Sequence, residues 1–303
     1  MKSLLCGLVA ACFAVTAVLM VNVVAANAAP NTKKAIVVVS FGTTFDDARK
    51  SCIESVETKI KEAFPDYEVR RAFTSKIVMK RLADRGIFIN SLEKTLDDLK
   101  AAGYEDIVLQ STHLTPGEEY DKKILAVADQ YRSNFNSLVI GRPVLMFDGA
   151  NNNPDDFAIA MAALCKQLPK LQEGEEIVFM GHGSPHQHNP AYQALQDEFD
   201  AAKIPVTIGV VEETDHPNLE DVIDRLAAKQ TVKSITLMPL MLVAGDHANN
   251  DMAGDEPDSW KNILQSKGYS INQPYLHGLG ENIAFQEIYV QHIKDAISGV
   301  DNK

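Results

Sequence analysis

Two histidines stand where side chains could bind a metal or move a proton. His182 ends the apolar stretch EIVFMGH (176–182) and lies between two glycines, which allow a ligand to approach the backbone closely. His247 follows a second apolar stretch, SITLMPLM (234–241), in the segment L-V-A-G-D-H-A-N-N-D-M. Imidazoles bind divalent transition metals and exchange protons near neutral pH. We therefore predict a metal site at these histidines; for His182 the alternative is a strand-end imidazole bonded to a carbonyl.

Two carboxylates follow apolar stretches in the same way. Glu119 lies in P-G-E-E-Y, and Glu212 directly ends VTIGVVE (206–212). A carboxylate at a strand end can bind a divalent ion or accept a proton. The alternative is an acid at a helix start, favoured by the helix dipole, and this interpretation suits Glu213 and Asp215. We favour a functional role for Glu212 because it follows the strand directly.

A second histidine cluster admits a different interpretation. His186 and His188 form H-x-x-x-H-x-H with His182, a spacing compatible with structural zinc. The segment is flanked by Pro185 and Pro190, however, so a loose surface cluster at a helix start is the commoner arrangement.

The remaining histidines and motifs carry less chemistry. His113 ends another strand-like stretch and could line the same site, whereas His277 and His292 are interpreted as structural. The sequence has no P-loop, G-x-G-x-x-G or G-x-S-x-G motif, so nucleotide-binding and serine-hydrolase functions lack support.

Strand-like apolar runs alternate with helical patterns along the chain. Several runs are apolar on both faces, as buried parallel strands are. The predicted strands are 34–41, 67–73, 106–112, 138–146, 176–182, 206–212, 234–241 and 269–276. The predicted helices are 46–64, 91–103, 154–168, 218–229 and a last one near 281–297. This alternation predicts an α/β fold with mostly parallel sheets flanked by helices.

The sequence also contains an internal repeat. AIVVVSFGTT (35–44) resembles EIVFMGHGSP (176–185), and DIVLQSTHLTPGEEYDK (106–122) resembles SITLMPLMLVAGDHANND (234–251). In this repeat His247 falls near Glu119. The repeat predicts two similar lobes with a cleft between them, where ligands meet the carboxyl ends of the strands.

The predicted domain boundaries follow from this repeat. We expect an N-terminal α/β lobe at 29–150 and a C-terminal α/β lobe at 151–280, joined near the polar segment 149–156. We further expect the last helix, about 281–300, to pack back onto the first lobe.

Residues 1–28 are predicted to be a cleavable signal peptide. Lys2 precedes a long apolar run, and Ala26-Asn27-Ala28 suits a cleavage site. The expected location is therefore the periplasm, with no membrane span in the mature chain. An uncleaved anchor and lipidation at Cys12 are the alternatives.

Net charge and cysteine content indicate which partners are disfavoured and what state the thiols have. Loss of Lys2 with the leader leaves 28 basic and 41 acidic residues, so the mature net charge of −13 disfavours nucleic acid as a partner. Cys52 and Cys165 remain after cleavage; an oxidising compartment would permit a disulfide between them, but we expect two buried free thiols.

Five segments together resemble one family, the anaerobic-pathway sirohydrochlorin cobaltochelatases, which belong with the class II-type tetrapyrrole chelatases. They are VVSFGTTFDDAR (38–49), RAFTSKIV (71–78), GEEYDK (117–122), VFMGHGSPH (178–186) and LMPLMLVAGDHANNDMAGDEPDSWK (237–261). The last block is the most specific, and the resemblance covers nearly the whole mature chain. The predicted leader is a departure, because many relatives act in the cytoplasm.

The resemblance implies a lyase of cobalamin biosynthesis that inserts Co²⁺, or alternatively Fe²⁺, into sirohydrochlorin with release of two protons. It implies two facing α/β domains, metal-site histidines at His182 and His247, and an acidic catalytic residue at Glu119. Glu212 lies where some members place a third metal ligand. The family forms homo-oligomers; no organic cofactor is expected, and whether haem binds stays open.

Our hypothesis is that two imidazoles from opposite lobes meet over one Co²⁺ ion, with Glu212 as third ligand. Glu119 would take a pyrrole proton or help deform the ring, and Arg71 and Lys76 are candidates for contacts to the substrate carboxylates. A periplasmic metal or tetrapyrrole carrier using the same cleft is the alternative from another class.

Overall fold

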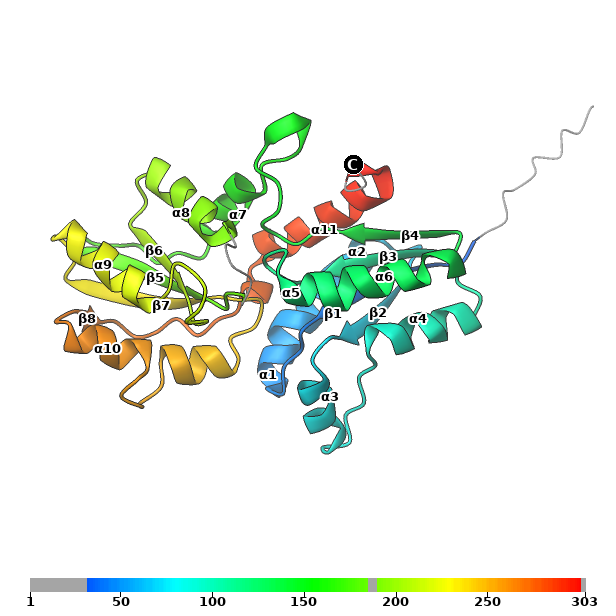
Figure 1. The fold of residues 1–303 in the computed structure, drawn as a ribbon, viewed down its shortest axis with the longest axis horizontal. Coiled ribbons are helices and arrows are strands. Elements are labelled where there is room, and N and C mark those ends of the chain that lie inside the picture. Colours follow the sequence, from blue (N-terminus) through cyan, green and yellow to red (C-terminus); the bar gives the residue numbers. More distant parts are fainter. Residues whose placement is uncertain (1–31, 185–189, 301–303) are drawn as a thin grey trace, which may run out of the picture. The chain divides into compact units, whose positions relative to one another are not determined.

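The computed structural model describes residues 32–184 and 190–300, and Thr32–Lys303 forms one compact unit. Two four-stranded parallel sheets flanked by helices confirm the predicted fold class (Figure 1). The predicted leader and the pair His186 and His188 lie outside the described residues.

The two sheets have the same strand order, β2-β1-β3-β4 in the first and β6-β5-β7-β8 in the second. Every pairing is parallel. The first sheet contains β1 (Lys34–Ser40), β2 (Glu68–Phe73), β3 (Asp106–Ser111) and β4 (Ser137–Gly141). The second contains β5 (Glu175–Gly181), β6 (Val206–Val210), β7 (Ser234–Leu240) and β8 (Ser270–Ile271).

Two strands are shorter than the sequence predicts, and proline explains both. β4 ends at Gly141 just before Pro143, and β8 ends at Ile271 shortly before Pro274. Proline has no backbone N–H to donate to a neighbouring strand, so regular pairing stops near it.

Helices connect the strands, and several start at clear caps. Ser91 caps α4 and Asn218 caps α9 through their side-chain oxygens, as short polar residues do at helix starts. The α-helices are α1 (Asp46–Ala48), α2 (Ser55–Ala63), α3 (Lys76–Ala83), α4 (Leu92–Ala101), α5 (Glu118–Tyr120), α6 (Ala126–Tyr131), α7 (Asp156–Leu164), α8 (Ala191–Ala201), α9 (Leu219–Lys229), α10 (Trp260–Ser266) and α11 (Ile283–Ser298). The π-helical segments are η1 (Arg49–Glu54), η2 (Asp121–Leu125) and η5 (Ala248–Met252), and the 3₁₀ segments are η3 (Arg132–Asn134), η4 (Ala150–Asn152) and η6 (Leu279–Glu281).

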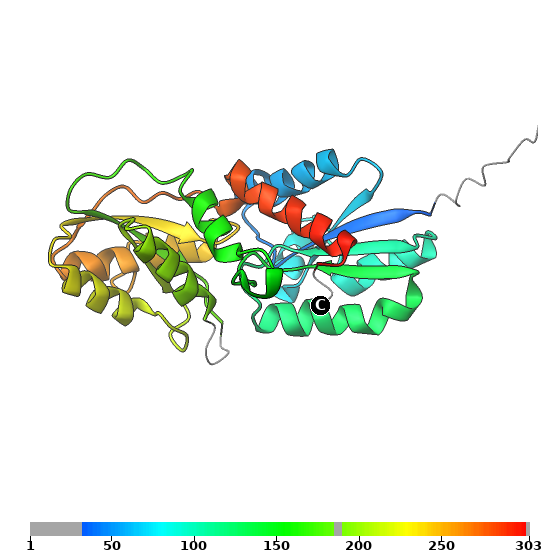
Figure 2. The ribbon, with the colours of Figure 1, turned by 90° about the horizontal axis from the view of Figure 1, so that it is seen from above.

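Both faces of each sheet are covered. Helices α2 and α11 lie on one face of the first sheet, opposite α6 (Figure 2), and α4 packs on the α6 side. The second sheet has α7 and α8 on one face and α9 and α10 on the other. We call the first sheet with α2, α4, α6 and α11 the N-terminal lobe, and the second sheet with α7 to α10 the C-terminal lobe.

The alternation along each central strand explains this layering. In β1, Ile36 faces the α2 and α11 side while Val37 faces the α4 and α6 side. In β5, Phe179 belongs to the same apolar cluster as Ile36. Because each fully buried side chain of this size contributes about 1.5–3 kcal/mol, that shared cluster ties the two lobes into one folded unit.

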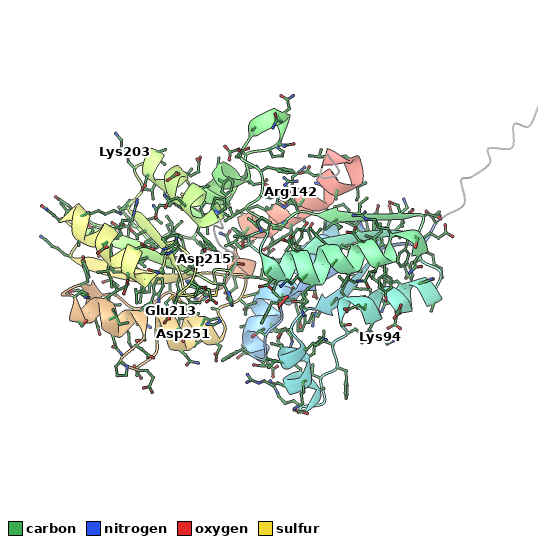
Figure 3. All side chains as sticks on the ribbon, in the orientation of Figure 1. Lys94, Arg142, Lys203, Glu213, Asp215 and Asp251 are labelled. Carbon is green, nitrogen blue, oxygen red and sulfur yellow. The ribbon has the colours of Figure 1, made fainter. Side chains whose placement is uncertain are left out.

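A buried ion-pair network adds to this connection. Arg142, which follows β4, donates from Nε to Asp156 of α7 at 2.8 Å and from Nη1 to Asp295 of α11 at 2.7 Å (Figure 3). The ring of His292 contacts the Arg142 carbonyl at 3.0 Å. In addition, Tyr289 of α11 donates to the Thr112 carbonyl at 3.2 Å, next to the end of β3.

Candidate functional site

His182 and His247 lie together at the carboxyl end of the second sheet. His182 directly follows β5, and His247 precedes η5 after β7. Because β5 and β7 are neighbouring parallel strands, their ends meet at the same edge. The two ring centroids are 4.8 Å apart with nearly perpendicular planes.

The expectation that these imidazoles come from opposite lobes is wrong. Both belong to the C-terminal lobe, because the strands that carry them pair side by side in one sheet. The N-terminal lobe supplies other chemistry to the site.

The His182 ring is set up as a neutral ligand. Its Nδ1 lies 3.1 Å from the Gly183 carbonyl, which can only accept, so the proton sits on Nδ1 and the Nε2 lone pair is left for a metal. Although part of the ring reaches solvent, the protein packed around it lowers its pKa, and the nearby His247 lowers it further. Metal binding requires an unprotonated nitrogen.

The His247 ring is oriented by a carboxylate. Its Nδ1 lies 2.5 Å from Oδ2 of Asp251, four residues along in the π-helical segment η5 (Figure 3). A carboxylate that accepts Nδ1–H fixes the tautomer and makes Nε2 a better metal ligand. The two rings therefore present the same nitrogen, each held by a different partner.

Glu119 and His113 follow β3 of the N-terminal lobe. Burial raises the pKa of the Glu119 carboxyl, and its Oε2 is buried with no hydrogen-bond partner among the described residues. His113 contacts the Ser111 hydroxyl through Nδ1 at 3.0 Å, while its buried Nε2 likewise has no partner in the described part of the chain. Burial, followed by the charge of His182, lowers the pKa of His113 to about 4.

Two segments of the N-terminal lobe lie beside the His182 loop. The Glu118 backbone N–H points at the Ser184 hydroxyl at 3.5 Å. A Cβ on Gly117 would lie 3.0 Å from that hydroxyl oxygen, so a side chain here would crowd Ser184. The Phe41 ring, after β1, lies 6.4 Å from the His182 ring. The carboxyl ends of both sheets thus contribute to one site.

Glu212 lies next to the histidine pair without completing a ligand set. Its N–H donates to the His182 carbonyl at 3.1 Å, and its carboxylate accepts from Thr214 at 3.1 Å. Within residues 32–184 and 190–300, no group of three His, Cys, Asp or Glu side chains is close enough together to hold a metal ion. The structure therefore brings two imidazoles together, and a role for Glu212 as third ligand stays a prediction.

The loop after His182 is held by residues that the sequence did not single out. Asp215, interpreted above as a helix-start acid, is buried before α9 and accepts from the Ser184 N–H at 2.8 Å. The buried Tyr192 hydroxyl accepts from the Gly183 N–H at 3.4 Å. Neither role has a local sequence signal, because each partner is distant along the chain.

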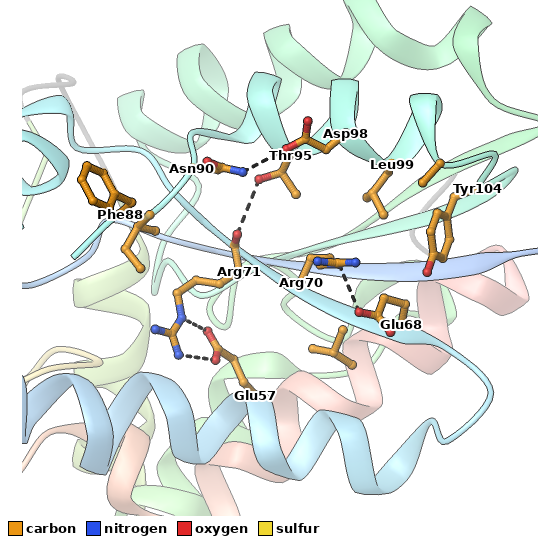
Figure 4. Close-up of a pocket in the computed structure, with 13 residues that line it drawn as sticks. Glu57, Glu68, Arg70, Arg71, Phe88, Asn90, Thr95, Asp98, Leu99 and Tyr104 are labelled. Atoms are coloured by element: carbon orange, nitrogen blue, oxygen red, sulfur yellow. Dashed lines mark hydrogen bonds and ion pairs between the residues drawn. The ribbon is translucent and has the colours of Figure 1, made fainter. Parts of the chain in front are cut away.

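Arg71 and Lys76, the candidates for contacts to the substrate carboxylates, differ in whether their charge is already paired. Arg71 is engaged by Glu57 through two hydrogen bonds of 2.7 and 2.6 Å and also by Glu54, so its charge is already neutralised. It lines a cavity of about 390 Å³ beside the edge strand β2, which none of the proposed site residues lines (Figure 4). Lys76 is exposed at the start of α3 and forms no salt bridge with any residue of the described chain.

Comparisons with known proteins place the chain in a family. The family model described as "Cobalt chelatase (CbiK)" matches residues 34–298. A sirohydrochlorin cobaltochelatase of Salmonella typhimurium is 39% identical over 267 residues, covering 88% of this chain and 97% of the relative. A second, named sirohydrochlorin cobaltochelatase CbiKC, from Nitratidesulfovibrio vulgaris, is 33% identical and covers 90% of this chain and 94% of its own length.

Solved structures support the fold. The sirohydrochlorin chelatase SirB from Bacillus subtilis subspecies spizizenii in complex with cobalt has a TM-score of 0.56 at 12% identity, with 90% of this chain and 98% of that chain covered. SirB from Bacillus subtilis with Fe³⁺ has a TM-score of 0.55 at 14% identity, with the same coverage. At these identities the similarity shows a shared fold.

Proposed function

The chain belongs to the cobalt chelatase (CbiK) family, and from that premise we propose that it inserts Co²⁺ into sirohydrochlorin with release of two protons. The observation that carries the proposal is the pair of imidazoles, whose ring centroids are 4.8 Å apart, with the Glu118–Glu119 segment of the other lobe in contact with the loop after His182. The names of the two relatives, each covered over more than nine-tenths of its length, support this substrate and metal.

The metal half of the reaction falls to the C-terminal lobe. His182 and His247 bind the arriving Co²⁺ through Nε2, since imidazole nitrogens suit this ion. With two protein ligands and bound water, the ion exchanges its remaining ligands for the ring nitrogens. Glu212 would serve as a third ligand after a small movement of its side chain.

The proton half falls to the N-terminal lobe. The ring carries two N–H protons on its four nitrogens, and both must leave as the four Co–N bonds form. Glu119 takes them one at a time and releases the first to water before it accepts the second, because burial raises the pKa of this carboxyl and makes its anion a stronger base than an exposed glutamate. The product carries the metal in place of two protons, so charge and atoms balance.

An absorbance assay with purified mature protein, metal-free sirohydrochlorin and Co²⁺ tests the proposal. We expect many metallated rings per protein molecule. A stoichiometric spectral change without turnover would instead identify a metal or tetrapyrrole carrier. Initial rates with Co²⁺, Fe²⁺ and Ni²⁺ under the same conditions rank the possible substrate metals.

We also propose that the protein is exported to the periplasm and forms homo-oligomers. Support for export comes from the signal-peptide pattern of residues 1–28, and the family match begins after it, at residue 34. Among the described residues, no helix is both long and apolar enough to cross a membrane. Cell fractionation with mass determination of the mature N-terminus tests the first proposal, and light scattering tests the second.

A further inference from the structure

Phe41 is an exposed aromatic side chain at the edge of the site. It directly follows β1, whose last residue Ser40 is fully buried, yet 45% of Phe41 is exposed. Its ring lies 6.4 Å from His182, which in turn lies 4.8 Å from His247. Exposed aromatics next to a candidate site are typical of surfaces that bind apolar or flat ligands.

The backbone that carries this ring is fixed by local contacts. Gly42 has φ +98°, and a Cβ there would lie 2.5 Å from the Phe73 ring, so the turn after Phe41 requires glycine. On the other side, the Ser75 N–H donates to the Phe41 carbonyl at 3.2 Å.

Two arginines brace the rest of the turn. Arg85 donates to the Thr44 carbonyl at 2.6 Å. The buried Arg49 donates to Asp46 at 2.7 Å, and Asp46 also pairs with Arg85. A ring presented by a rigid turn loses little conformational freedom when a ligand binds.

The repeat gives the position of Phe41 a counterpart. β1 and β5 occupy the same place in the two sheets, and each is followed by one residue and then a glycine with positive φ, Gly42 at +98° and Gly183 at +85°. Phe41 therefore corresponds to His182. The same position carries a metal-binding side chain in one lobe and an apolar ring in the other.

We propose that the Phe41 ring is a contact surface for the flat face of the tetrapyrrole, and this inference rests on the proposed function. Aromatic side chains prefer offset-stacked or edge-to-face contacts with other rings. Phe41 positions the macrocycle while His182 and His247 present the ion, so its loss weakens ring binding and leaves Co²⁺ binding unchanged.

Equilibrium titration of metal-free sirohydrochlorin, without metal present, tests the proposal. Phe41→Leu keeps an apolar side chain but removes the aromatic face, and Phe41→Trp restores one. We expect the dissociation constant for the ring to rise about 10-fold in Phe41→Leu and to return near the wild-type value in Phe41→Trp. Phe88→Leu is the matched control, because Phe88 is 80% exposed and lies beside the separate cavity at β2.

Each outcome separates this inference from the proposed function. If the wild type inserts cobalt but Phe41→Leu binds the ring as tightly as the wild type, the Phe41 proposal is overturned and the function stands. If the wild type binds the ring without inserting metal, the function fails and the titration still decides the role of Phe41. If the wild type does not bind the ring, both are wrong.

Discussion

The two lobes share a strand order but carry different chemistry at matching strand ends. After β5 and β7 the C-terminal lobe places His182 and His247, whereas after β1 and β3 the N-terminal lobe places Phe41 and Glu119. The duplicated scaffold thus provides the same positions twice. In the proposed mechanism, the C-terminal lobe binds the ion and the N-terminal lobe binds the ring and takes its protons.

The protein environment shifts the pKa of one site residue in each lobe. Protein packed around His182 lowers its pKa, which favours the neutral imidazole that a metal ligand needs. Protein around Glu119 strengthens its carboxylate as a base. Burial produces both shifts, because it disfavours the charged form of either group.

We expect the largest effect on cobalt insertion from removing a metal ligand of the C-terminal lobe. His247→Ala removes one of two imidazole ligands and should lower cobalt insertion about 1,000-fold, equivalent to about 4 kcal/mol, while the protein still folds and binds the metal-free ring. Initial rates and circular dichroism check this. His277→Ala is the control, since His277 is exposed and its ring contacts Glu281 and Tyr275 rather than either imidazole of the pair. Near-normal turnover of the His247 variant would refute the assignment.

A second prediction concerns the network that joins the lobes. Asp156→Asn leaves the buried Arg142 without one carboxylate partner and should lower the free energy of unfolding by about 3 kcal/mol at pH 7. Chemical denaturation of both proteins measures this difference. An unchanged free energy of unfolding would show that the network contributes nothing to stability.

The same variant carries a pH signature. Burial alone would raise the Asp156 pKa, but hydrogen bonds from His292 and Arg142 lower it below the ordinary value of 3.8. The stabilisation is therefore present above pH 3.8 and is lost as the pH falls through the lower, folded-state pKa. We expect the free energy of unfolding of the wild type to fall more steeply below about pH 4 than that of Asp156→Asn; parallel curves would contradict this.

The proton acceptor of the N-terminal lobe has a smaller expected effect. Glu119→Gln keeps the shape of the side chain but cannot take a proton, so kcat should fall about 100-fold with Co²⁺ affinity unchanged. The neighbouring Glu118→Gln is a matched control, because Glu118 pairs with Lys122 in an ordinary helix-surface ion pair. Weaker Co²⁺ binding by Glu119→Gln would show that Glu119 helps to bind the ion and would contradict the proposed difference between the two lobes.

The smallest expected effect comes from the residue behind a ligand. Asp251→Asn keeps a hydrogen-bonding group near Nδ1 of His247 but removes the charge, so Co²⁺ affinity should fall about 10-fold. Calorimetric titration of Co²⁺ measures it. If Asp251→Asn matches the wild type, the carboxylate does not tune the imidazole.

Local patterns predicted the strands well because they are apolar, buried on both faces and bounded by turns. Helix α3 was not predicted, since it has only eight residues and its first two, Lys76 and Ile77, are exposed. Likewise β8 was overestimated because the apolar pattern runs through Pro274, where regular pairing stops.

The site was predicted in its residues but not in its layout. Strand-end position singled out His182 and His247. The lobe bounds predicted from the repeat, 29–150 and 151–280, already put both in the C-terminal lobe, so the hypothesis of opposite lobes conflicted with them, and the pairing of β5 with β7 confirms the bounds on this point. The roles of Asp215, Tyr192 and Phe41 depend on contacts between distant segments. No local spacing encodes such contacts.

Co²⁺ titration in the absence of tetrapyrrole tests whether His182 and His247 bind the metal ion. Calorimetry and the visible absorption of bound Co²⁺ would compare the wild type with the His182→Ala/His247→Ala double variant. We expect a Co²⁺ site with nitrogen ligands in the wild type and no such site in the double variant. Equal affinity and an unchanged spectrum in the double variant would contradict it.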